Sequence, residues 1–180
     1  MLRILCVAVL GTLTACSPAL DWRLVTIPEA GLQASLPCKP DQVQRSVELA
    51  GTPVDMHMSG CEADGATFAV ACAAVQDPAQ TGAALTHWRA AVLAGLQAPA
   101  EGHAGAPRNM PFLPTGALNI PPSVRTEVQG RSRDGASVAA QGVWCARVQG
   151  TRVQACHASV LSAQPRLAQA DQFFAGLVLQ

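Results

Sequence analysis

The N-terminal segment most constrains how this chain folds, because it decides the compartment in which folding takes place. Arg3 gives the segment a positive start, residues 4–13 are apolar apart from Gly11 and Thr12, and small residues then lead to Cys16. A charged start, an apolar run and a small-residue site, in this order, are typical of a secretory signal. The apolar run spans about ten residues, whereas a membrane-spanning helix needs roughly twenty. We therefore expect the rest of the chain to be exported and to fold where disulfide bonds are permitted.

The small-residue site reads Leu13-Thr14-Ala15-Cys16, which resembles the lipobox of bacterial lipoproteins. The resemblance implies that Cys16 receives a thioether-linked diacylglycerol, that residues 1–15 are removed as a signal peptide, and that the new amine is acylated, for example with palmitate. Ser17 follows Cys16 where Asp would favour the inner membrane, so the same resemblance implies the periplasmic face of the outer membrane of a Gram-negative bacterium. Several acyl chains together would hold the protein stably on the bilayer. The alternative is an ordinary cleaved signal with an incidental cysteine.

The remaining sequence has the length of one domain with a sizeable core. We expect residues 16–21 to form a short lipidated tether and residues 22–180 to form that domain. The chain holds 12 Lys and Arg against 12 Asp and Glu, so charge gives no support for a nucleic-acid partner.

Alternation of apolar and polar residues predicts strands, and helical spacing predicts two helices. We expect four strands over residues 31–36, 43–49, 54–59 and 67–75, with Trp22 to Ile27 as a further start of the fold. Asp77 and Pro78 then begin a helix whose apolar face carries Leu85, Trp88, Val92 and Leu96. Residues 97–123 hold six prolines and form a long loop, which in a compact domain is usually functional or disordered. Three strands follow from Val124 to about Leu161, and Pro165 opens a final helix with Leu167, Ala170, Phe174 and Leu177 on one face.

This order of elements predicts an α+β fold, an antiparallel sheet of about seven strands with two helices packed against it. It resembles the α/β/α sandwich of PsbP-like domains in its layout. The features that carry this resemblance are Ser35-Leu36-Pro37-Cys38-Lys39-Pro40 at the end of an early strand and the closing Phe173-Phe174-Ala175-Gly176-Leu177.

Five cysteines remain beyond the lipobox, so at least one of them cannot pair within the chain. Cys38 and Cys61 end two strands and form the disulfide that we expect. A two-residue turn at Gly150-Thr151 sets Cys145 opposite Cys156, as either a second disulfide or two small core side chains. Cys72 is expected to be the buried free thiol, because an Asp64-Gly65 turn sets Cys61 opposite Phe68 instead.

Histidines beside sulfur-containing residues raise the question of a metal or thiol site. Met56 and Met58 point away from His57 in a strand, and His157 points away from Cys156 and lies opposite Trp144 as a packing pair. No motif of a serine hydrolase, zinc protease or phosphate-binding loop is present. We therefore assign no catalytic residue, no metal site and no cofactor.

These observations favour a non-enzymatic, lipid-anchored envelope protein that acts by binding or as an accessory module, with its protein partner unknown. One alternative is a carrier of a small ligand that uses residues 97–123 as a lid. A weaker alternative is a thiol-based enzyme or sensor that uses Cys72.

Overall fold

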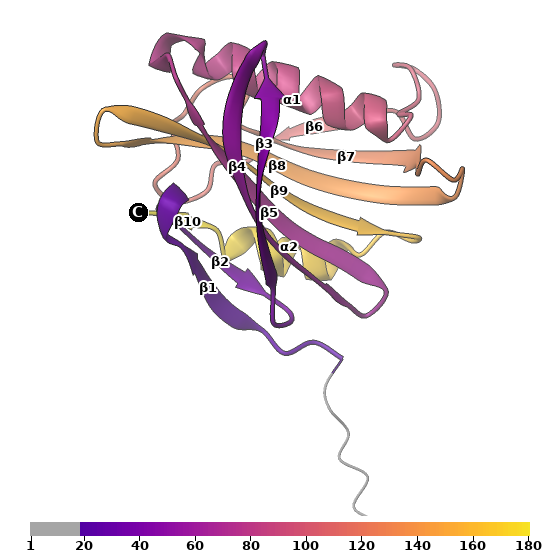
Figure 1. Ribbon diagram of the computed structural model, residues 1–180. Coiled ribbons are helices and arrows are strands. Elements are labelled where there is room, and N and C mark those ends of the chain that lie inside the picture. The colour runs from indigo at the N-terminus through magenta and orange to yellow at the C-terminus, as the bar shows by residue number, and fades with distance from the viewer. Residues whose placement is uncertain (1–18) are drawn as a thin grey trace, which may run out of the picture.

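The structure, a computed structural model, describes residues 19–180, so the signal peptide and the lipidation site at Cys16 lie outside the described residues (Figure 1). The strands are β1 (Arg23–Ile27), β2 (Leu32–Leu36), β3 (Asp41–Leu49), β4 (Thr52–Ala63), β5 (Ala66–Val75), β6 (Arg108–Pro111), β7 (Val124–Arg131), β8 (Ser137–Gln149), β9 (Arg152–Ser162) and β10 (Val178–Leu179). The helices are α1 (Thr81–Gly95) and α2 (Leu167–Ala175), with short 3-10 turns η1 (Pro28–Ala30) and η2 (Pro78–Gln80).

Seven strands form one antiparallel sheet in the order β3-β4-β5-β9-β8-β7-β6. Two tight turns fix much of its register. Asp64 and Gly65 both have positive φ, as a type I′ hairpin requires, and Cys61 lies opposite Phe68 as predicted. Gly150 and Thr151 connect β8 to β9, which confirms the predicted pairing of residues on these strands. The near-continuously apolar β5 is a central strand, since β4 and β9 flank it.

The expected α+β sandwich is wrong, because the described chain is mainly β and contains a second sheet. The β1 and β2 strands are not part of the large sheet. They pair with each other on either side of η1, and β2 also pairs with β10 at the C-terminal end of the chain. Ile27, Leu32 and Leu36 of this small sheet are buried against the large one. Strands therefore cover a face that the sequence pattern had assigned to helices alone, and the PsbP-like arrangement is not found.

The large sheet separates two cores. Figure 1 shows α1 along one side of this sheet and α2, β1 and β2 along the other. The core on the side of the small sheet contains Phe68, Val143, Val160 and the α2 residues Phe173 and Phe174. The core beneath α1 includes Val75, Leu85, Trp88, Trp144, Ala146 and Val153.

Residues 97–123 are not a structureless loop. They contain β6, which pairs with β7 along the edge of the large sheet. The amide of Leu118 donates to the carbonyl of Ala146, and the carbonyl of Thr115 accepts from the amide of Leu179. The segment therefore borders both sheets and is bonded to each. Within residues 19–180, no helix is long and apolar enough to cross a membrane.

Candidate functional site

The α1 helix covers the large sheet unevenly along its length. It follows η2, where the Asp77 side chain accepts a hydrogen bond from the amide of Ala79 at 2.9 Å and Pro78 occupies the first turn. Leu85 and Trp88 in its first half are buried, whereas Val92 and Leu96 further along are only half-buried. The predicted helical face is therefore real, but its C-terminal half is less buried, even though the carbonyl of Leu96 accepts a hydrogen bond from the amide of Arg131 on β7.

A pocket of about 230 Å³ lies between this half of α1 and strands β7, β8 and β9. It is lined by Val92, Leu93, Leu96, Thr126, Val128, Ala140, Gln141, Gly142, Trp144, His157, Ser159 and Leu161. None of these residues carries a formal charge once His157 is neutral, and most of the lining is aliphatic or aromatic. Apolar walls with a few polar groups are typical of sites for small molecules.

Trp144 and His157 form the floor of this site. They are directly opposed on β8 and β9, as predicted, and their rings stack with centroids 4.2 Å apart and an interplanar angle of 15°. Trp88 of α1 packs against the imidazole in a T-shaped arrangement, with centroids 5.8 Å apart and an interplanar angle of 72°. The packing role expected for this pair is therefore confirmed.

The stacked pair also has a feature that the sequence did not reveal. His157 is 8% exposed and Trp144 is 2% exposed, yet the imidazole Nε2 and the indole Nε1 have no hydrogen-bond partner among the described residues. Buried polar atoms are nearly always paired, because an unpaired one loses its hydration without compensation. An unpaired buried imidazole in the wall of an apolar pocket therefore indicates a group that a ligand or a water molecule would bind.

Gly142 makes room for the rings on the floor of the pocket. A Cβ atom at this position would lie 2.7 Å from Cη2 of Trp144 and 2.8 Å from Nε2 of His157, closer than real Cβ contacts allow. The same distance places Nε2 directly beside Gly142, which itself lines the pocket. The absence of a side chain at Gly142 therefore leaves the buried, unpaired nitrogen next to a residue that lines the pocket.

Burial determines the charge of the site. Desolvation lowers the pKa of His157 to about 3, so its imidazole is neutral at physiological pH. A general base works best with a pKa near the operating pH, and this imidazole is far too weak a base for that role. A neutral imidazole still donates or accepts a hydrogen bond at Nε2 according to its tautomer. The geometry therefore suits binding of an uncharged molecule.

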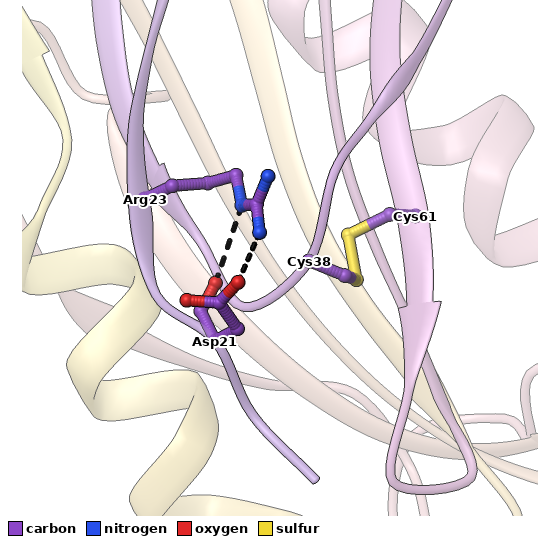
Figure 2. The surroundings of a disulfide bond; sticks show 4 residues. All are labelled: Asp21, Arg23, Cys38 and Cys61. Atoms are coloured by element: carbon purple, nitrogen blue, oxygen red, sulfur yellow. Dashed lines mark hydrogen bonds and ion pairs between the residues drawn. A yellow bond between two sulfur atoms is a disulfide. The ribbon is translucent and has the colours of Figure 1, made fainter. Parts of the chain in front are cut away.

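The cysteines are only partly arranged as predicted. Cys38 and Cys61 are joined by a disulfide with Cα atoms 5.9 Å apart, at the rim where the small sheet meets β4 (Figure 2). Close to this bond, Arg23 forms an ion pair with Asp21 in the segment that leads into β1. This is the pair that the sequence favoured.

The prediction that Cys72 is the free thiol is wrong, and of the two alternatives left open for Cys145 the structure shows the buried core side chain. Cys72 is not a free thiol but is bonded to Cys156, and the possible Cys145–Cys156 disulfide is absent, with Cys145 buried and free. Cys156 lies directly opposite both Cys72 on β5 and Cys145 on β8. A residue in an antiparallel sheet forms a wide hydrogen-bonded pair on one side and a close pair on the other. The Cα atoms of Cys72 and Cys156 are 4.2 Å apart, so the bond forms on the close side.

The lid expected from residues 97–123 does not cover this pocket, since none of the lining residues comes from that range. Residues 101–108 instead border a separate depression of about 450 Å³ next to β7. Its lining contains none of the unpaired buried atoms found in the described chain, so it offers no comparable binding group. The part of the chain covered by the structure also contains no cluster of three His, Cys, Asp or Glu side chains that could hold a metal ion.

Comparison with known proteins adds no assignment to this geometry. No protein-family model matches the sequence, and no curated protein matches it significantly.

Proposed function

We propose that this protein is a lipid-anchored, non-enzymatic binding protein on the periplasmic face of the outer membrane of a Gram-negative bacterium. Its binding site is the pocket between α1 and the large sheet, and its ligand is a small, mainly apolar molecule. The single observation that supports binding best is the unpaired, buried Nε2 of His157, a residue that lines a mainly apolar pocket. The anchor rests on the lipobox resemblance of Leu13-Thr14-Ala15-Cys16.

Binding is tested with 4-ethyltoluene, an uncharged substituted benzene. An engineered cavity of about 150 Å³ accommodates benzene, so a pocket of about 230 Å³ should accommodate a somewhat larger ring. Titration should shift the indole N–H signals of Trp88 and Trp144 in protein-detected NMR, a readout that partitioning of the probe into detergent does not mimic. Unchanged indole signals up to the solubility limit of the probe would contradict the proposal.

A blocking variant and a matched control locate the site. Leu96→Trp places a larger side chain at a half-buried position of the pocket wall and should abolish the shifts. Leu113→Trp makes the same change at an exposed leucine outside the pocket and should leave binding intact. Equal binding by both variants would show that the probe sits elsewhere.

Anchoring is tested by Cys16→Ser. We expect an uncleaved or unacylated precursor that no longer partitions tightly with membranes. Cys6→Ser, within the signal but outside the lipobox, should be processed and retained normally. Full acylation and membrane retention of the Cys16 variant would remove the basis for the anchor.

A thiol-based enzyme or sensor cannot use Cys72 as its free thiol, because Cys72 is in a disulfide. The remaining thiol, Cys145, is a poor substitute. Burial raises its pKa to about 12, and the reactive species of a cysteine is the thiolate. Thiol labelling of the native protein should therefore be slow and should become fast only after unfolding.

A further inference from the structure

We infer that the ligand of the α1 pocket is an uncharged, mainly apolar molecule that carries a hydroxyl group, of the alcohol or phenol class, and that this hydroxyl bonds to Nε2 of His157. This inference rests on the proposed binding function and specifies the chemistry of the ligand.

The pocket excludes ionic ligands. No lysine, arginine, aspartate or glutamate is among its lining residues, and His157 is held neutral by its burial. A carboxylate or ammonium group placed there would lose its hydration without gaining an opposite charge, which is strongly unfavourable. A fatty acid or an amine in its charged form is therefore a poor occupant, whereas a neutral molecule is not penalised.

The unpaired imidazole selects the polar group of the ligand. Nε2 donates a hydrogen bond in one neutral tautomer and accepts one in the other. A hydroxyl can act as acceptor or donor, so it satisfies Nε2 in either tautomer, whereas a carbonyl or an ether satisfies only one. A hydroxyl group therefore fits this site whichever of the two imidazole nitrogens of His157 carries the proton.

The shape of the pocket selects the body of the ligand. Val92, Leu96, Val128, Ala140 and Leu161 provide aliphatic walls of the pocket. The volume of about 230 Å³ lies below the range of roughly 300–1,000 Å³ for drug-sized ligands. A single substituted ring or a short branched chain is therefore expected, rather than a long acyl chain or a polycyclic molecule.

Three probes of similar size test the inference on the full processed protein. They are 4-ethylphenol with a hydroxyl, 4-ethyltoluene with a methyl group in its place, and 4-ethylbenzoate with a carboxylate. Free probe concentration is fixed by equilibrium dialysis, and binding is followed by the indole N–H signals of the protein. Because a hydrogen bond to a buried unpaired group contributes about a factor of ten, 4-ethylphenol should bind about tenfold more tightly than 4-ethyltoluene once each affinity is corrected for the transfer of the probe from water to an apolar solvent. The carboxylate should bind more weakly than either.

Two variants identify the residue responsible for this preference. His157→Phe keeps a ring on Trp144 but removes Nε2, so the preference for the phenol should vanish while 4-ethyltoluene still binds. Ser159→Ala removes another hydroxyl-bonding group of the lining and should leave the preference unchanged. The comparison of the three probes on the unaltered protein does not depend on whether either variant folds.

The outcomes distinguish failure of the proposed ligand class from failure of the proposed binding function. Binding of neither uncharged probe would overturn the proposed binding function as well as its ligand class. Equal corrected affinities of 4-ethylphenol and 4-ethyltoluene would overturn only the ligand class, and would indicate that a water molecule already satisfies Nε2. Tighter binding of the carboxylate would also overturn it.

Discussion

The neutral state of buried His157 should make the stability of the fold depend on pH. Desolvation lowers the pKa of this imidazole from an ordinary 6.5 to about 3 in the folded chain. Between these values the unfolded chain binds a proton that the folded chain does not bind, so the free energy of unfolding falls as pH falls. The stabilising contribution is fully present above about pH 6.5 and is lost progressively toward pH 3.

The loss of stability on acidification follows from the pH range between the two pKa values of His157. Each unit of pH inside it costs about 1.4 kcal/mol, so acidification from pH 7 to about pH 4.5 should remove roughly 2–3 kcal/mol of stability through this residue alone. That is a large part of the stability of a typical domain, about 5–15 kcal/mol.

The assay compares urea unfolding at the two pH values for three proteins. His157→Phe keeps an aromatic ring against Trp144 but removes the titration, so it should lose roughly 2–3 kcal/mol less than the natural protein over this range. His87→Gln removes an exposed histidine of α1 and should follow the natural protein. An identical pH dependence of the natural protein and His157→Phe would refute the assignment of His157 as a buried neutral base.

Three further predictions address the fold. Cys38→Ser and Cys61→Ser should each lower the free energy of unfolding by about 2–5 kcal/mol, and the double variant by about the same amount, since the disulfide is lost once; additive losses would contradict this. Gly142→Ala should destabilise by about 1–3 kcal/mol because its Cβ has no room against the stacked rings, whereas Gly95→Ala, which meets open space, should be neutral or stabilising in thermal unfolding. Limited proteolysis should first cut the exposed stretch 100–104. First cuts within β5 would contradict its place as a buried central strand.

The sequence predicts features that depend on neighbours along the chain. The turns at Asp64-Gly65 and Gly150-Thr151 were identifiable from their residue types, and counting outward from them gave the correct partners on β4–β5 and β8–β9. The same counting placed Trp144 opposite His157, which is the floor of the candidate site. Asp77 and Pro78 likewise indicated the start of the 3-10 turn η2, which leads directly into α1.

The errors concern contacts between distant parts of the chain. No local pattern states that β5 pairs with β9, so the sequence does not reveal that Cys72 lies next to Cys156, and the prediction of a free Cys72 is wrong for this reason. Nothing near β1 and β2 indicates that β2 pairs with the two-residue β10 as well as with β1, so the sequence does not predict the second sheet. The pocket beside Val92 and Leu96 depends on how α1 packs over β7, β8 and β9, which the periodicity of the helix does not encode.

The pairing of β5 with β9 also sets an order of events during folding. These strands form the joint between the strands that precede α1 and those that follow it, and Cys72 and Cys156 are 84 residues apart. Such long-range pairing is slow, because a large loop must close before any contact compensates for it. A chain synthesised from its N-terminus can close the ring between Cys38 and Cys61, only 23 residues apart, while the partner of Cys72 is still missing. The Cys72 thiol therefore remains unpaired until Cys156 has been made. During this time it is most open to forming an incorrect disulfide.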